Sequence, residues 1–166
     1  MLKIITSMKD LDFGQLKRVY QESICSDGKL NHHDLSENIG VLQAEHDFYG
    51  YLKLFFRQGG SMCAVWAPEG VYQAVLRLEP YADGLLLSGL ETAPGSRRRG
   101  FANALIKAVV DKLGKNGEIL LYSHVDKHNW ASLAVHNSCG FDRIKEYAVY
   151  SDGSVLHSSC TFCKRI

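Results

Sequence analysis

The stretch from residue 85 to residue 125 places the strongest constraint on the fold, because strand, helix and strand patterns follow one another there. Its first part, Leu85–Thr92, is almost unbroken in apolar side chains, which is typical of a strand covered on both faces. Its last part, Glu118–Val125, is strand-like again. A strand–helix–strand unit predicts two parallel strands joined by a right-handed crossover. The helix between them has an apolar face made of Phe101, Leu105, Ala108, Val109 and Leu113.

Other strand-like runs come in pairs around turn signals, which predicts antiparallel hairpins beside the parallel unit. The turn signals are Pro68-Glu69-Gly70 and Ser151-Asp152-Gly153. We therefore expect an α+β fold with a mixed, mostly antiparallel sheet of about six or seven strands, one central parallel pair and helices on both faces. The predicted strands are Leu2 to Ile5, Ser61 to Trp66, Val71 to Leu78, Leu85 to Thr92, Glu118 to Val125, Phe141 to Tyr150 and Ser154 to Cys163.

Two helices are predicted before the first hairpin. Apolar residues recur at helical spacing from Leu11 to Cys25, and Asp27-Gly28 is expected to end that helix. A second helix is predicted from Leu35 to Phe56, and Asp34 is expected to cap it. The cap explains His32-His33-Asp34 better than a metal site does. A further helix, Trp130 to Cys139, is predicted after the parallel unit, with Asn129 as its N-cap.

The second helix is apolar on two sides. One side can pack on the sheet while the other lines a pocket, and the interpretation that both belong to the core stays equally open. Gly40 and Gly50 weaken the helix and leave a break in it open. The two stripes consist of Leu35, Ile39, Leu42, Tyr49, Leu52 and Phe56, and of Phe48, Tyr51 and Phe55.

The loop from Glu91 to Ala102 joins the central strand to the helix and is suited to bind phosphate. Gly95 and Gly100 allow turn conformations and a close approach of the backbone to a ligand. At the helix start, free N–H groups and the helix dipole attract an anion, and Arg97 to Arg99 add positive charge. The loop lacks the glycine spacing of nucleotide triphosphatases and dinucleotide dehydrogenases, which argues against both classes.

Size and composition fit a single domain spanning residues 1–166, with 46% hydrophobic and 22% charged residues. The formal net charge of +1 offers no general attraction to nucleic acid or to an anionic membrane, so neither is expected as a partner. No apolar run approaches the roughly 20 residues of a membrane span, and the N-terminus lacks a signal-peptide core. We expect a cytoplasmic protein.

The five cysteines are scattered, which favours reduced, mostly buried thiols over a disulfide framework. Cys160 and Cys163 have the spacing of a metal-binding pair. Because no second Cys/His pair stands at zinc spacing, packing is the favoured interpretation. No metal cofactor is expected.

Two short motifs lie in and after the parallel unit. Residues 97–102 read Arg-x-x-Gly-x-Ala, which resembles the pyrophosphate-binding motif of the GNAT superfamily of N-acetyltransferases. Residues 129–141 read Asn-x-x-Ser-x-x-x-His-x-x-x-Gly-Phe, which resembles the later motif of that superfamily at every spacing. The resemblance covers residues 85 to 141 well and implies the GNAT fold.

The resemblance also implies acetyl-CoA as the co-substrate. The strand end at residues 90–92 would pair its backbone with the pantetheine arm, residues 98–103 would donate N–H groups to the pyrophosphate, and Asn129 would hydrogen-bond the arm. The residues implied in this binding are Leu90, Glu91, Thr92, Arg97, Arg98, Arg99, Gly100, Phe101, Ala102, Asn103, Asn129 and Ser132.

Three residues are the candidates for catalysis: Glu91, His124 and His136. His136 replaces the tyrosine with which the superfamily usually protonates the departing thiolate. An imidazole with a pKa of about 6.5 can do the same, and a buried histidine without a catalytic role stays equally open. Glu91 and His124 rank level as the base for the amine, and Glu79 ranks third. Deprotonation through water would need no single base.

The implied activity is transfer of an acetyl group from acetyl-CoA to a primary amine, by direct attack in a ternary complex. The amine can belong to a small molecule or a peptide, and the aromatic residues between 48 and 56 slightly favour a small molecule with apolar parts. The alternative is a catalytically silent acyl-CoA-binding sensor or partner module of the same fold, which the histidine at position 136 motivates. Formation of a homodimer stays open.

Overall fold

Seven strands form the main sheet of the computed structural model, which describes residues 1–115 and 117–166. Their order is β1-β2-β3-β4-β5-β9-β6, and β7 and β8 form a separate two-stranded sheet. Among the described pairings only β4 and β5 run parallel, which confirms the expected mixed sheet with one central parallel pair. The strands are β1 (Leu2–Ile5), β2 (Met62–Trp66), β3 (Ala74–Tyr81), β4 (Gly84–Thr92), β5 (Leu120–Asp126), β6 (Asp142–Lys145), β7 (Ala148–Val149), β8 (Val155–Leu156) and β9 (Ser159–Arg165).

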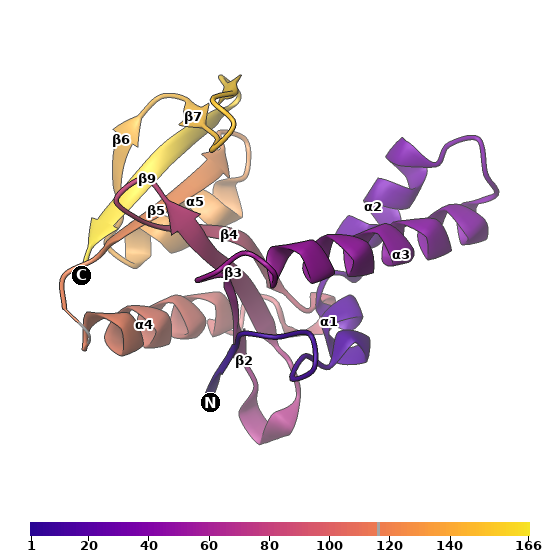
Figure 1. Cartoon of the computed structure of the whole chain (residues 1–166), viewed down its shortest axis with the longest axis horizontal. Coiled ribbons are helices and arrows are strands. Elements are labelled where there is room, and N and C mark those ends of the chain that lie inside the picture. The colour runs from indigo at the N-terminus through magenta and orange to yellow at the C-terminus, as the bar shows by residue number, and fades with distance from the viewer. Residues whose placement is uncertain (116) are drawn as a thin grey trace.

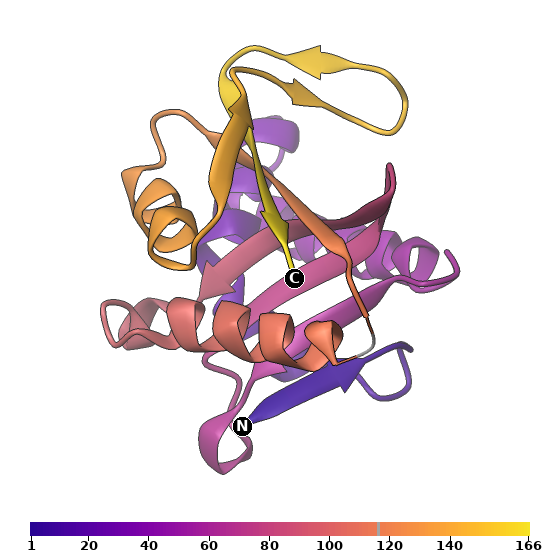
Figure 2. The same cartoon turned by 90° about the vertical axis from the view of Figure 1, so that its left-hand side faces the viewer.

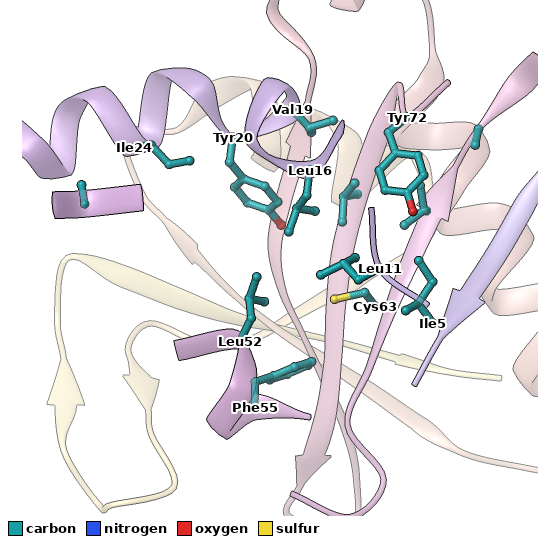
Figure 3. Close-up of a cluster of buried hydrophobic side chains, with 14 residues drawn as sticks. Ile5, Leu11, Leu16, Val19, Tyr20, Ile24, Leu52, Phe55, Cys63 and Tyr72 are labelled. Atoms are coloured by element: carbon teal, nitrogen blue, oxygen red, sulfur yellow. The ribbon is translucent and has the colours of Figure 1, made fainter. Parts of the chain in front are cut away.

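Helices cover both faces of this sheet, as predicted (Figures 1 and 2). Side chains of β2 alternate between two cores: Cys63 and Val65 pack on the side of α1, α2 and α3, whereas Ala64 packs on the side of α4. Figure 3 shows the first of these cores, with Tyr20 reaching toward the sheet. The helices are α1 (Phe13–Val19), α2 (Gln21–Asn31), α3 (Glu37–Phe55), α4 (Phe101–Gly114) and α5 (Trp130–Ser138).

The central parallel strands pair only over part of their length. Leu85–Leu87 pair with Leu121–Ser123, and β4 and β5 separate beyond these residues. The register between β3 and β4 also shifts next to Gly89, which has a φ of 55°. The sheet is therefore open at the carboxyl ends of its two central strands, where the chain leads into α4 and α5.

The first hairpin is confirmed, because β2 pairs antiparallel with β3. β3 begins at Ala74 rather than at the predicted Val71, since Val71 belongs to the preceding turn and donates its N–H to the Pro68 carbonyl oxygen at 3.1 Å. The strand extends to Tyr81, which pairs with Gly84 of β4.

The C-terminal region differs from the two long strands that were predicted. The segment 141–150 splits into β6 and β7, and the segment 154–163 into β8 and β9, with β9 lying between β5 and β6. β7 and β8 leave the main sheet as a hairpin around the expected turn. The Tyr81 hydroxyl and the His124 ring bind the carbonyl oxygen of Val149, which holds this hairpin against the body of the protein.

The predicted single helix from Leu11 to Cys25 is wrong, because two helices, α1 and α2, follow one another there. Its predicted end is wrong as well, since α2 continues through Asp27 and Gly28. Gly28 faces α3, where an added Cβ would lie 2.9 Å from the backbone of Gly40 and Val41. This glycine permits close helix packing and does not stop the helix.

The second predicted helix is confirmed as α3, and neither Gly40 nor Gly50 breaks it. Asp34 is not its N-cap: Ser36 occupies that position, because the helix begins later than the apolar pattern indicates.

The two predicted stripes of this helix do not match its buried face. Ile39 and Leu42 are 54% and 63% exposed, whereas Leu52 and Phe55 are buried. The first half of α3 packs on α2, and the two helices extend away from the sheet as a pair (Figure 1). Along α3, the core on this face receives Ala44, Leu52 and Phe55, with Val41 and Phe48 packed against it.

Candidate active site

A cavity of about 620 Å³ lies at the opening between β4 and β5. It brings together the end of β4, the loop before α4 and the first turns of α4 and α5. Every residue predicted to contact the cofactor lines it except Arg99. The lining residues are Leu90, Glu91, Thr92, Arg97, Arg98, Gly100, Phe101, Ala102, Asn103, Asn129, Ala131, Ser132 and Val135.

The N-terminus of α4 borders this cavity. Gly100 is the N-cap with a φ of 79°, Arg98 has a φ of 60°, and no side chain in the described ranges caps the helix. The N–H groups of residues 101–103 precede the first intrahelical bond, which Ala104 donates to Gly100. Free N–H groups and the helix dipole together favour an anion at this point.

The three arginines of the loop differ in their surroundings. Arg97 pairs with Glu22 of α2 at 2.7 Å, an exposed contact that stabilises the fold little. Arg98 lines the cavity. Arg99 lies over the ring of Phe101, 5.0 Å from its centroid, and outside the cavity lining. Arg98 is thus the arginine best placed to meet an anion.

Asn129 begins α5, and its predicted role as N-cap is confirmed. Its side-chain oxygen accepts a hydrogen bond from the Ser132 N–H at 3.0 Å. Because this bond fixes the amide oxygen, the NH2 group is the part that can donate to a ligand. Ala131 and Val135, which the sequence reasoning missed, also line the cavity from α5. Their spacing of one helical turn was the available signal.

A smaller cavity of about 180 Å³ lies between the separating strands. Leu87–Leu90 of β4 and Ser123–Asp126 of β5 line it, together with Asn129, Ser132 and His136. The two cavities share Leu90, Asn129 and Ser132, so they adjoin at the same opening.

His136 reaches this smaller cavity from α5 and is only 1% exposed. Its Nδ1 lies 2.8 Å from the Ser132 carbonyl oxygen and 3.3 Å from the Ser132 hydroxyl. A carbonyl oxygen can only accept, so the shorter contact requires the proton on Nδ1. The buried Nε2 has no partner among the described residues. In the neutral ring, Nε2 therefore presents a lone pair.

Burial lowers the pKa of His136 below its ordinary value of 6.5, and the hydrogen bond to Ser132 opposes this only in part. The rings of Phe141 and Phe162 pack against the imidazole with centroids 5.2 and 5.6 Å away. The neutral ring consequently prevails at neutral pH, and in this form Nε2 is a proton acceptor.

His124 also lines the smaller cavity, but both of its nitrogens have partners. Nε2 lies 3.0 Å from the Val149 carbonyl oxygen, and Nδ1 lies 3.1 Å from the Thr161 hydroxyl. Burial lowers the pKa of this histidine too. Its contacts connect β5 to the C-terminal hairpin.

The two candidate glutamates lie on the face covered by α1, α2 and α3. Glu91 lines the larger cavity and accepts a hydrogen bond from the Ser23 hydroxyl of α2 at 2.7 Å. Glu79 lies farther along β3, where the Ser88 hydroxyl approaches it at 3.4 Å. Glu91 therefore combines access to the cavity with a fixed orientation.

The roles of three residues near the opening, Tyr20, Arg77 and Gly89, were not predicted from the sequence. The Tyr20 hydroxyl donates to the Gly89 carbonyl oxygen, and the Arg77 guanidinium lies against the Cα of Gly89. No local sequence motif predicts these contacts, because they join the region of α1 and α2 to two strands that are distant in sequence.

In the described ranges, no group of three His, Cys, Asp or Glu side chains is arranged to hold a metal ion. Within the same ranges, no helix has the length and apolar character needed to cross a membrane.

A sequence model described as the acetyltransferase (GNAT) family matches residues 27–141. The chain belongs to the GNAT family. Among curated GNAT relatives, the [ribosomal protein bS18]-alanine N-acetyltransferase of Escherichia coli (strain K12) is 29% identical over 106 residues. That match covers 62% of this chain and 65% of the relative, slightly under two thirds of its length.

Solved GNAT structures share the fold. The ribosomal-protein-alanine N-acetyltransferase from Brucella melitensis matches with a TM-score of 0.67 and 17% identity over 100% of this chain and 99% of that chain. The PaiA N-acetyltransferase from Thermoplasma acidophilum, in complex with coenzyme A, matches with a TM-score of 0.63 and 14% identity over 100% and 99%. These likenesses confirm the predicted GNAT fold.

Proposed function

We propose that this protein is an acetyl-CoA-dependent N-acetyltransferase that acts on a primary amine by direct attack in a ternary complex. The observation that carries the proposal is that both sequence motifs line the same cavity at the opening between β4 and β5. A neighbour solved with coenzyme A supports the choice of co-substrate. Relatives named for acetylating alanine of a ribosomal protein support an amine acceptor, including the N-terminus of a peptide.

The proposed binding roles follow the cavity lining. The backbone of residues 90–92 is assigned to the pantetheine arm, and the N–H groups of residues 98–103, with Arg98, to the pyrophosphate. The NH2 group of Asn129 is assigned to an amide of the arm. Arg97 and Arg99 contribute positive charge near this point.

The reaction needs a route for one proton. The amine nitrogen bonds to the thioester carbonyl carbon, the carbon–sulfur bond breaks, and the proton lost by nitrogen ends on sulfur. We assign this transfer to His136, whose Nε2 lone pair takes the proton and then returns it to the departing thiolate. The imidazole thus acts as an acid only after it has acted as a base.

Glu91 is the proposed partner of the incoming ammonium group. Its carboxylate is fixed by Ser23 and borders the cavity, so it can hold the acceptor and take its first proton. His124 ranks below it, since both of its nitrogens are engaged. Glu79 is the more remote alternative.

The test is release of CoA thiol from acetyl-CoA across amines, amino acids, polyamines, aminoglycosides and peptides. We expect turnover of at least one class, and a loss of about a hundredfold or more in kcat in a His136→Phe variant that still binds acetyl-CoA. His46→Phe is the matched control, because that histidine is 80% exposed on α3. Binding of acetyl-CoA without turnover of any acceptor would favour the silent sensor instead.

A second variant tests the pyrophosphate assignment. Arg98→Ala removes a charge-assisted contact, so we expect acetyl-CoA affinity to fall by roughly tenfold or more while the melting temperature stays unchanged. Calorimetric titration of acetyl-CoA measures the effect. Arg143→Ala, on exposed β6, is the control. Full affinity in the Arg98 variant would contradict the placement of the phosphates.

A further inference from the structure

Arg77 brings an unassigned positive charge to the opening of the sheet. It lies in the middle of β3, on the face covered by α1, α2 and α3. Its guanidinium lies against the bulge of β4, because a Cβ added to Gly89 would stand 2.5 Å from Arg77 Nη2. Gly89 also lines the smaller cavity that His136 borders. The charge is therefore next to the proposed place of acetyl transfer.

In the described part of the chain, no carboxylate oxygen lies within 4 Å of this charge. Arg77 Nε is buried without a hydrogen bond, and the ion pairs among described residues do not include its guanidinium. Its neighbours are the rings of Tyr20 and Tyr51, whose centroids lie 5.8 and 5.0 Å from its Cζ. A partly desolvated cation without a direct ion pair is unfavourable, so it favours an anion from outside the chain as a partner.

The same face offers negative charge on either side of Arg77. Glu79 is the next residue of β3 on that face, and Glu91 pairs in register with Val75, the preceding one. Neither carboxylate forms an ion pair with Arg77 in the described structure. A molecule with an ammonium group and a nearby carboxylate would find a complement for each charge.

We propose that Arg77 binds a carboxylate of the acceptor close to the amine that is acetylated. The inference rests on the proposed acetyl transfer and names its substrate class: a free amino acid, or a peptide that begins with an acidic residue. A guanidinium can hold a carboxylate through two parallel N–H···O bonds, and Arg77 is only partly buried.

A different task for Arg77 would be to stabilise negative charge on the thioester oxygen. That task would serve every acceptor equally, whether or not the acceptor carries a carboxylate. A comparison of each acid with its own amide therefore separates the two roles.

The experiment measures kcat/KM for free L-amino acids against their α-carboxamides, and for amidated tripeptides beginning with Asp or Glu against those beginning with Asn or Gln. In the native protein we expect acids to exceed amides by about ten- to a hundredfold in one of the two series, which identifies the source of the carboxylate. Arg77→Gln should abolish the preference by lowering kcat/KM for the acids about ten- to a hundredfold more than for the amides, and Arg77→Lys should keep part of the preference. Equal rates for acids and amides in the native protein would overturn the inference. So would an equal loss for both in Arg77→Gln.

Calorimetric binding of the same acids and amides to the CoA-loaded protein supplies a readout that needs no turnover. Arg57→Gln, at an exposed position, is the matched control and should behave as the native protein does. Arg77-dependent binding of acids without any turnover would refute the proposed transfer and keep the anion site. Turnover without an Arg77-dependent preference would refute the anion site and keep the transfer.

Discussion

His136 stands where the superfamily uses a tyrosine hydroxyl, and its environment sets a testable pH dependence. Burial lowers its pKa below 6.5, and the proposed transfer requires the neutral ring. We therefore expect kcat to be insensitive to this group above pH 6.5 and to fall as the pH drops through the lowered pKa. The test compares the pH dependence of kcat between about pH 5 and pH 8 in the native protein and in His136→Phe. An acid limb that persists unchanged in the variant would assign it to another residue.

Most residues around the larger cavity could be named from the sequence because they belong to local motifs, whereas Ala131 and Val135 were missed. The glycine and arginine spacing predicted Arg98 and Gly100 as site residues. The helix-start motif predicted Asn129. Arg77 and Tyr20 could not be found in this way. Their importance comes from contacts with Gly89 across strands and helices, which no local spacing encodes.

The packing of α2 on α3 was not predicted from the sequence. Two glycines of this helix pair, Gly28 and Gly50, provide a matched test of how closely the helices pack. Gly28→Ala places a Cβ 2.9 Å from the backbone of α3, so we expect the free energy of unfolding to fall by about 1–3 kcal/mol. Gly50→Ala meets nothing within 4 Å on the same helix pair and should raise it by about 0.5–1 kcal/mol. Urea unfolding measures both. Stabilisation by Gly28→Ala would show that the two helices do not pack closely in solution.

Elements were predictable where local pattern and tertiary position agree. The β4–α4–β5 unit was predicted correctly, because its apolar run, its amphipathic helix and its glycines all indicate the same structure. The C-terminal strands were too long in the prediction, since their residues remain β-rich where β7 and β8 leave the main sheet. That departure depends on contacts of Val149 with Tyr81 and His124, which are remote in sequence.

In the whole molecule, the proposed site of acetyl transfer lies where side chains from both faces of the sheet approach the same strand. His136 reaches the opening from the face of α5, whereas Tyr20 and Arg77 reach Gly89 from the other face. The register shift at Gly89 lets both sets of side chains approach the same strand. Side chains from both faces of the sheet therefore lie near the point where the central strands separate.

The stability of the whole chain should depend on pH through His124 and His136. Burial lowers the pKa of both, so the unfolded state binds more protons below pH 6.5. The stabilisation is complete above pH 6.5 and is lost as the pH falls, by at most about 1.4 kcal/mol per pH unit for each histidine. Urea unfolding between about pH 7.5 and pH 5.5 should show this slope in the native protein and a smaller slope in His124→Gln and His136→Phe. Equal slopes in the native protein and in both variants would mean that neither histidine is held neutral by the fold.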